Sequence, residues 1–225
     1  MPLMAAVQVL AGIGLVLGFG LFFPGPMPAR SALFVSTGVT VINLYLIGLV
    51  LVPQLVGQQK LAKTYDFIQS IPVPRAVAFL AWWSVTLVVG APAMAASLVT
   101  AALRYHQAFA ISLAIVPATV LVSLTSIAIG YAVGNAVGQP MVTNVITQVL
   151  NIFAIGFAPV CFPPEQLPGW LQTLNQVLPF ESMAIVMRTA LTSGGTENVL
   201  RAYAVLGVWT VACLGVAGWS VVRRG

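Results

Sequence analysis

Charged residues are scarce in this chain of 225 residues, and their scarcity excludes most soluble protein classes. Charged side chains make up 6% of the sequence, hydrophobic residues make up 60%, and the mean hydropathy is +1.02. Soluble domains carry about 25% charged residues, because their surfaces must face water. So few charges cannot cover a water-facing surface, and the composition therefore predicts an integral membrane protein.

The few charges are not gathered into a binding surface. Nine Lys and Arg residues against four acids give a net charge of +5. The cations are scattered along the chain and form no stripe that would follow a phosphate backbone, so nucleic acid is not an expected partner. They are expected instead at the edges of the membrane, in contact with lipid headgroups, where Lys and Arg mark the ends of spans.

Cysteine, histidine and acidic residues are also rare, which leaves little for catalysis or metal binding. Cys161 and Cys213 are far apart and form no CxxC or Cys/His cluster, so both are expected to be unpaired structural residues and no metal site is predicted. His106 is the single histidine and falls in a polar loop, which does not favour the Ser/His pair of an intramembrane protease. No catalytic residue is predicted, and the chain is not expected to be an enzyme.

Two further absences bear on how transport could be driven. The sequence has no GxxxxGK[ST] phosphate loop, so ATP is not expected to bind to this chain, and no cofactor is predicted for it. Every Asp and Glu lies outside the apolar runs, whereas a proton- or sodium-coupled carrier usually keeps an ionisable group at membrane depth. A coupled carrier is therefore disfavoured, but it stays an alternative because carriers that use neutral groups exist.

Long hydrophobic runs are what the sequence has in abundance. A membrane helix needs about 20 apolar residues to cross about 30 Å of hydrocarbon. Prolines and short polar turns separate the runs, so the sequence predicts an all-α membrane protein with one transmembrane domain over residues 1–225. Six transmembrane helices are expected, at about 4–23, 32–53, 77–101, 108–134, 141–160 and 200–221.

An even number of spans places both chain ends on one side of the membrane. With the termini in the cytoplasm, five cations fall on the inner side and four on the outer side, so the count of Lys and Arg is nearly even. The Arg223-Arg224 pair at the carboxyl end and the position of three of the four acids on the outer side favour this orientation. The predicted location is the cytoplasmic membrane. The first run could instead be a signal peptide, although its amino end has no Lys or Arg and no clean cleavage site follows it.

The longest inner loop, residues 55–75, has the pattern of a short amphipathic helix. Apolar residues recur at helical spacing with charged and amide residues between them, and a Pro-x-Pro then favours an extended link into the next span. Such a helix either anchors the loop at the membrane surface or docks a cytosolic partner. The residues expected to make its contacts are Lys60, Lys63, Tyr65, Asp66 and Ile68.

Residues 161–192 are too polar and too rich in proline to form a simple span. Prolines and an early Glu165 suit the amino end of one short helix, and a second short helix is expected over 181–192. Two broken helices on the outer side predict a re-entrant hairpin, whose backbone is buried against protein or water. Its marker residues are Pro164, Pro168, Trp170, Pro179 and Arg188.

Polar side chains form a stripe along the fifth span and a thinner one along the second. Helical spacing places each set on one face of its helix. An amide in hydrocarbon is costly unless it is paired. Two interpretations stay open: the stripes hydrogen-bond within one bundle, or they line a path or a dimer seam. The residues are Asn144, Thr147, Gln148 and Asn151 on the fifth span, and Thr40 and Asn43 on the second.

Together these segments resemble the permease subunits of ABC-2 type ATP-binding cassette exporters. In that family six spans carry a cytosolic coupling helix between the second and third, where residues 63–75 stand here, and an outer re-entrant hairpin between the fifth and sixth. The resemblance covers nearly the whole chain. It implies a cytosolic position for residues 55–75, a separate ATPase subunit that holds ATP and Mg, and a second permease copy in a homo- or heterodimer.

The expected function is export of an amphiphilic, lipid-like or drug-like substrate, that is, efflux of the multidrug kind. The stripes hold amides and hydroxyls but no charge, which suits such a substrate better than an ionic one. One departure concerns the amino end, because family members usually begin with a cytosolic amphipathic helix that is not seen before the first span here. Either that helix is absent or the true start lies upstream. A membrane channel or scaffold without an ATPase is the alternative function.

Overall fold

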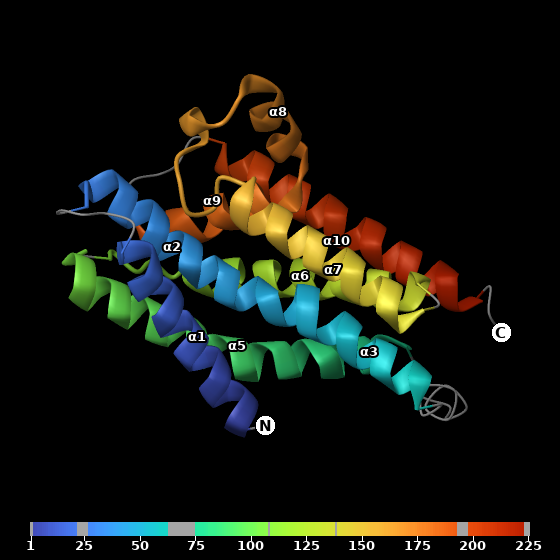
Figure 1. Cartoon of the computed structure of the whole chain (residues 1–225). Coiled ribbons are helices and arrows are strands. Elements are labelled where there is room, and N and C mark those ends of the chain that lie inside the picture. The colour runs from blue at the N-terminus through green and yellow to red at the C-terminus, as the bar shows by residue number, and fades with distance from the viewer. Residues whose placement is uncertain are drawn as a thin grey trace.

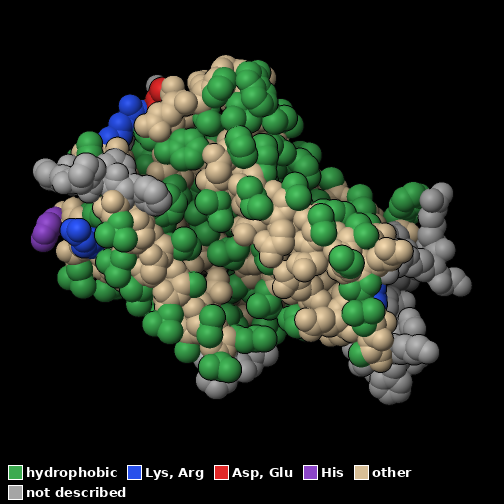
Figure 2. Space-filling model, viewed as in Figure 1, with side chains coloured by type: hydrophobic (Ala, Val, Ile, Leu, Met, Phe, Trp, Pro, Cys, Tyr) green, Lys and Arg blue, Asp and Glu red, His purple; other side chains and the backbone are tan. Residues whose placement is uncertain are grey.

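The described part of the chain is a bundle of helices. The computed structural model describes residues 2–21, 27–62, 75–107, 109–137, 139–192 and 198–222. Within these ranges every regular element is a helix, which confirms the predicted all-α fold. Figure 2 shows hydrophobic side chains over most of the visible face, with the few charged groups near its ends.

Within the described ranges, five helices are long and apolar enough to cross a membrane. The remaining expected span, the fifth in the sequence, is the shorter apolar helix α7 (Pro140–Gly156) of 17 residues. At 1.5 Å per residue α7 reaches about 26 Å, somewhat short of a hydrocarbon core of about 30 Å. The chain is thus a multi-pass membrane protein, while the count of six spans stays a prediction. The five spans are Leu3–Leu21 in α1 (Pro2–Leu21), Ala29–Leu61, Val77–Tyr105 in α5, Ile115–Ala136 in α6 and Val199–Trp219 in α10.

The helix that carries the second span continues past Pro53, where the sequence predicted its end. The helix runs from Ala29 to Leu61 through α2 (Ala29–Leu46), a π-helical turn η1 (Ile47–Leu51) and α3 (Val52–Leu61). Proline lacks an amide hydrogen, and its ring crowds the carbonyl four residues earlier. The wider π turn directly before Pro53 relieves that crowding, and Pro53 then stands in the first turn of α3, where proline is tolerated.

Three other predicted boundaries shift as well. The third span, α5 (Arg75–Tyr105), continues past residue 101, and the fifth ends at Gly156 because Pro159 follows closely. The fourth, α6 (Ile115–Ala136), begins after residue 108. Residues 109–114 lie along the end of α9 (Pro179–Leu191) instead, where Ala110 N and Ser112 N donate to the Leu191 and Ala190 carbonyl oxygens at 3.1 and 3.0 Å. Those carbonyls end a helix and need partners from outside it.

The centre of the bundle is α2. All residues from 34 to 45 are buried, and the helix packs against α1, α5, α6 and α9. The adjoining η1 contacts α6 through glycines, because a Cβ on Gly130 would overlap the carbonyl oxygen of Gly48. Small residues allow such close approach between helices in a membrane.

The two short helices expected over residues 161–192 are present. A 3₁₀ turn, η2 (Pro164–Gln166), precedes α8 (Gly169–Val177), so the first helix begins later than its prolines predicted. The second, α9 (Pro179–Leu191), buries ten of its 13 residues against α10 (Val199–Val222), α6 and α2. Figure 1 shows α8 at the edge of the bundle, on the side away from the last turn of α3 and the end of α10. Insertion of this pair into a bilayer from outside stays a prediction.

Candidate functional site

The predicted coupling helix is represented in the described residues by Lys60. Lys63, Tyr65, Asp66 and Ile68 lie outside them. Lys60 Nζ, in the last turn of α3, donates to the carbonyl oxygens of Gly134, Asn135 and Val137 at 2.5, 3.4 and 2.8 Å.

Those three carbonyls stand at the end of α6, where helix carbonyls lack partners within the helix. A cation there also opposes the negative end of the helix dipole. Lys60 therefore caps α6, and its charge is directed toward the bundle. Its expected docking role is not tested by these contacts.

Two further contacts join α3 to the start of α7. Gln54 Nε2 donates to Asn144 Oδ1 at 2.9 Å. The backbone of Gly57 lies against Pro140, whose Cβ would be 3.2 Å from a Cβ added to that glycine. α3 thus packs along both α6 and α7 (Figure 1).

The polar stripe of α7 is divided between its surface and its packed side. Asn144 and Gln148 are exposed, whereas Thr147 is fully buried and donates to the Asn144 carbonyl oxygen at 2.9 Å. Asn151 is half-buried, and its Oδ1 has no hydrogen-bond partner among the described residues. Along the same helix α7 exposes a broad apolar surface formed by Met141, Val145, Val149 and Ile152.

The second-span stripe is enclosed within the bundle. Thr40 and Asn43 have no exposed surface. Thr40 Oγ1 lies 3.4 Å from Ser97 Oγ on α5, and a Cβ on Gly12 of α1 would come within 2.7 Å of Asn43 Nδ2. Neither side-chain polar atom of Asn43 has a hydrogen-bond partner in the part of the chain that the structure describes. Both residues thus face α1 and α5, and their role in a path or seam is untested.

Arg188 is the most firmly held of the predicted hairpin residues. Its side chain is 6% exposed, Nε donates to Thr37 Oγ1 at 3.2 Å, and Nη2 donates to the Val160 carbonyl oxygen at 3.0 Å. The guanidinium carbon lies 3.8 Å from the centre of the Phe34 ring. Arg188 therefore ties α9 to α2 and to the chain that leaves α7, with a cation–π contact on one face.

The other predicted hairpin residues mark the ends of the short elements. Pro164 opens η2, Pro168 precedes α8, and Pro179 opens α9, as expected of prolines at helix starts. Trp170 is 69% exposed on the outer face of α8. An exposed Trp on an apolar helix face is typical of the membrane interface.

An exposed ion pair, which the sequence pattern did not indicate, connects η2 to the start of α2. Arg30 Nη2 and Glu165 Oε1 are 2.7 Å apart. A backbone hydrogen bond, together with the bond from Arg30, lowers the pKa of the Glu165 carboxyl. Exposed pairs contribute little to stability, so this contact mainly positions η2.

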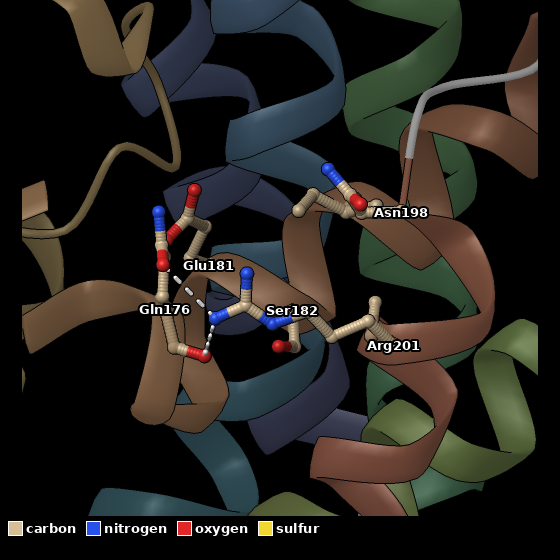
Figure 3. Close-up of a pocket in the computed structure, with 7 residues that line it drawn as sticks. Gln176, Glu181, Ser182, Asn198 and Arg201 are labelled. Atoms are coloured by element: carbon tan, nitrogen blue, oxygen red, sulfur yellow. Dashed lines mark hydrogen bonds between the residues drawn. The ribbon is translucent and has the colours of Figure 1, made fainter. Parts of the chain in front are cut away.

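A small pocket of about 70 Å³ lies where α8, α9 and α10 meet. Figure 3 shows Arg201 reaching from α10 toward Gln176 of α8, with Glu181 beside it. Burial raises the pKa of the Glu181 carboxyl, while Arg201 and Arg188 oppose that change. Sequence reasoning missed this pocket because its residues come from three helices and follow no motif. The lining residues are Gln176, Glu181, Ser182, Ile185, Asn198, Arg201 and Ala202.

Metal-binding residues do not gather anywhere in the described ranges. No group of three or more His, Cys, Asp or Glu side chains comes together there. Cys161 and Cys213 are both buried and unpaired.

A comparison with known families covers nearly the whole chain. The family model described as ABC-2 family transporter protein matches residues 4–219, which include all the helices described above except their outermost residues. No curated protein matches the chain. The matching family is the one that the inner loop and the proline-rich hairpin resemble, so the suspected resemblance is confirmed.

Proposed function

This chain belongs to the ABC-2 family of transporter proteins, and on that premise we propose that it is the permease subunit of an ATP-driven exporter. Permeases of this family are membrane subunits that are not themselves catalytic and that normally work with ATPase partners. The multi-pass helical fold and the lack of a phosphate loop agree with a membrane subunit that depends on a separate ATPase. A separate ATPase subunit would hold ATP and Mg and supply the energy.

The observation that carries the proposal is the firm connection of α3 to α6 and α7. On this proposal, residues at about 60–71 seat on the ATPase and move with it when ATP binds. Lys60 holds the end of α6, while Gln54 and Gly57 hold the start of α7. The movement therefore reaches the α6–α7 connection directly, as in a rigid lever.

The exposed face of α7 is the surface we propose for the second permease copy, identical or related. Asn144 and Gln148 are amides on a helix face that otherwise exposes apolar side chains. Asn144 Oδ1 already accepts from Gln54, but both amides remain on the exposed face. An amide that faces hydrocarbon with unfilled hydrogen-bonding groups is costly, and a second copy can supply partners for them. Thr40 and Asn43 would join a path only in a state in which α1 or α5 has moved away from α2.

The proposed substrate is amphiphilic, and lipid-like or drug-like. It would lie between the two permeases and leave on the outer side beneath α8 and α9, with both termini in the cytoplasm. The polar groups of the α7 and α2 stripes are uncharged, which supports a substrate with little net charge.

Charge reversal in the inner loop tests the docking role. Lys63→Glu combined with Asp66→Lys should reduce the amount of ATPase that copurifies with the chain and the ATP-dependent export measured in membrane vesicles. Arg30→Glu, on the far end of α2, is the matched control and should leave both unchanged. Unchanged copurification and transport in the loop variant would remove the docking role. Export that survives ATP depletion while a proton gradient persists would favour a coupled carrier instead.

A further inference from the structure

The pocket between α8, α9 and α10 holds two opposite charges that do not pair with each other. Arg201 Nη2 donates to the backbone oxygen and to Oε1 of Gln176 at 3.2 and 3.1 Å, and both acceptors are neutral. Glu181 Oε2 is buried and has no hydrogen-bond partner among the described residues. Figure 3 shows the two side chains approaching the same pocket from different helices.

The unpaired groups define the chemistry of a ligand. A buried carboxylate oxygen without a donor is costly, and a cationic N–H group relieves that cost best. Both hydrogen bonds from Arg201 to Gln176 are donated by Nη2, so the N–H groups of Nε and Nη1 can bind an anion. Ser182 and Asn198 add neutral hydrogen-bonding groups to the lining. The chemistry of the lining therefore suits a compact group that carries both a primary ammonium and a phosphate.

Exposed apolar residues stand next to pocket residues in the sequence of α8 and of α10. Val177 follows Gln176 in α8 and is 63% exposed, and Leu200 precedes Arg201 in α10 and is 85% exposed. Trp170 and Leu174 extend the exposed face of α8. Trp209 Nε1 donates to the Val177 carbonyl oxygen at 2.8 Å, which fixes α8 against α10. A polar pocket bordered by apolar helix faces matches an amphiphile, with its headgroup in the pocket and its acyl chains along the helices.

We propose that this pocket binds the headgroup of an amine-bearing phospholipid, with the ammonium on Glu181 and the phosphate on Arg201. A primary ammonium donates three N–H bonds, whereas the trimethylammonium of choline donates none. The site should therefore distinguish phosphatidylethanolamine from phosphatidylcholine with the same acyl chains. This proposal does not depend on ATP-driven export, because it concerns occupation of the pocket in the isolated chain.

The test measures lipid binding to the purified chain in detergent, by native mass spectrometry and by the thermal unfolding midpoint. The probes are phosphatidylethanolamine, phosphatidylcholine and phosphatidylglycerol with matched chains, and soluble glycerophosphoethanolamine. Phosphatidylethanolamine should bind about tenfold more tightly than phosphatidylcholine, the difference expected for one charge-assisted hydrogen bond. The soluble headgroup at the same concentration should bind far more weakly.

Two pocket variants and one control pair complete the test. Glu181→Gln should abolish the preference for phosphatidylethanolamine over phosphatidylcholine, and Arg201→Gln should weaken binding of all three phospholipids by a similar factor. Arg30→Gln and Glu165→Gln change the exposed acid–base pair outside the pocket and should leave the preference intact. Equal binding of the two zwitterionic lipids, or a preference that survives Glu181→Gln, would overturn the proposal. Binding of the soluble headgroup as tightly as the lipid would overturn the assignment to a membrane lipid.

Discussion

Replacing Arg188 by lysine should destabilise the chain more than replacing it by methionine. The guanidinium is buried and makes two hydrogen bonds and a stacked contact on Phe34. Each hydrogen bond from a charged group contributes about 1.5–3 kcal/mol, and a desolvated cation–π contact about 2 kcal/mol. Against these gains stands the cost of removing a charge from water, which is several kcal/mol.

The two substitutions differ in whether a charge stays buried at position 188. Lysine keeps the buried charge but lacks the planar fork that reaches Thr37 and Val160 together, so its expected cost is about 3–5 kcal/mol. Methionine loses the same contacts but removes the charge. Thr37 Oγ1 still donates to the Leu33 carbonyl oxygen at 2.8 Å, so the main remaining cost is the unpaired Val160 carbonyl, about 1–3 kcal/mol.

The assay is the unfolding midpoint of the purified chain in detergent, with yield of folded protein as a second readout. Arg188→Lys should unfold at the lowest temperature, Arg188→Met at an intermediate one. Arg30→Lys and Arg30→Met are matched controls, because Arg30 is 66% exposed, and they should change the midpoint little. A lysine variant as stable as the original chain, or a methionine variant less stable than the lysine variant, would refute the reasoning.

Three further predictions concern the helix ends, the helix contacts and pH. Lys60→Met should lower the unfolding midpoint by an amount equal to about 1–2 kcal/mol, because the α6 carbonyls lose their cap, and Lys60→Arg should retain part of it. Gly130→Ala should sharply reduce the yield of folded protein, because a Cβ there would overlap the Gly48 carbonyl, whereas Gly156→Ala adds a methyl group in open space and should have no such effect. Burial raises the pKa of Glu181 above its ordinary 4.5, so the folded chain holds that proton more tightly and loses stability as pH rises from 4.5 through the raised pKa. At pH values above that window, Glu181→Gln should therefore raise the unfolding midpoint, and at lower pH it should leave the midpoint unchanged. A lower midpoint for Glu181→Gln at neutral pH would contradict the expected direction of the effect.

The sequence predicted the membrane class and most of the helices because burial in lipid depends on long apolar runs, which are local. It misplaced the end of the second span because Pro53 is a helix breaker in most contexts. The π turn of Ile47–Leu51 relieves the crowding by the proline ring and lets the helix continue. The sequence of those five residues did not indicate it. This turn accompanies the close contact between Gly48 and α6, which exists only once the helices are packed.

The residues of the candidate site were predicted only in part, because their contacts also depend on how the helices pack. Arg188 was marked as a hairpin residue because it stands near the end of the second predicted short helix, but its partners Thr37 and Val160 are distant in the sequence. Lys60 was expected to contact a partner, and that role stays a prediction. Its bonds to the carbonyls at the end of α6 could not be predicted, because those carbonyls are more than 70 residues away in the sequence. The Glu181 and Arg201 pocket was not predicted, because it depends on the packing of three helices.

The central proposal is that this chain works as one of two permeases driven by separate ATPases through α3. Native mass spectrometry of the complex purified by a tag on this chain, in a mild detergent, tests it most directly. The account predicts a mass equal to two permease chains, identical or related, and two phosphate-loop ATPase subunits, with loss of the ATPases in the Lys63→Glu and Asp66→Lys double variant. A tagged chain that purifies alone or only with further copies of itself, at normal yield and with export intact, would contradict it.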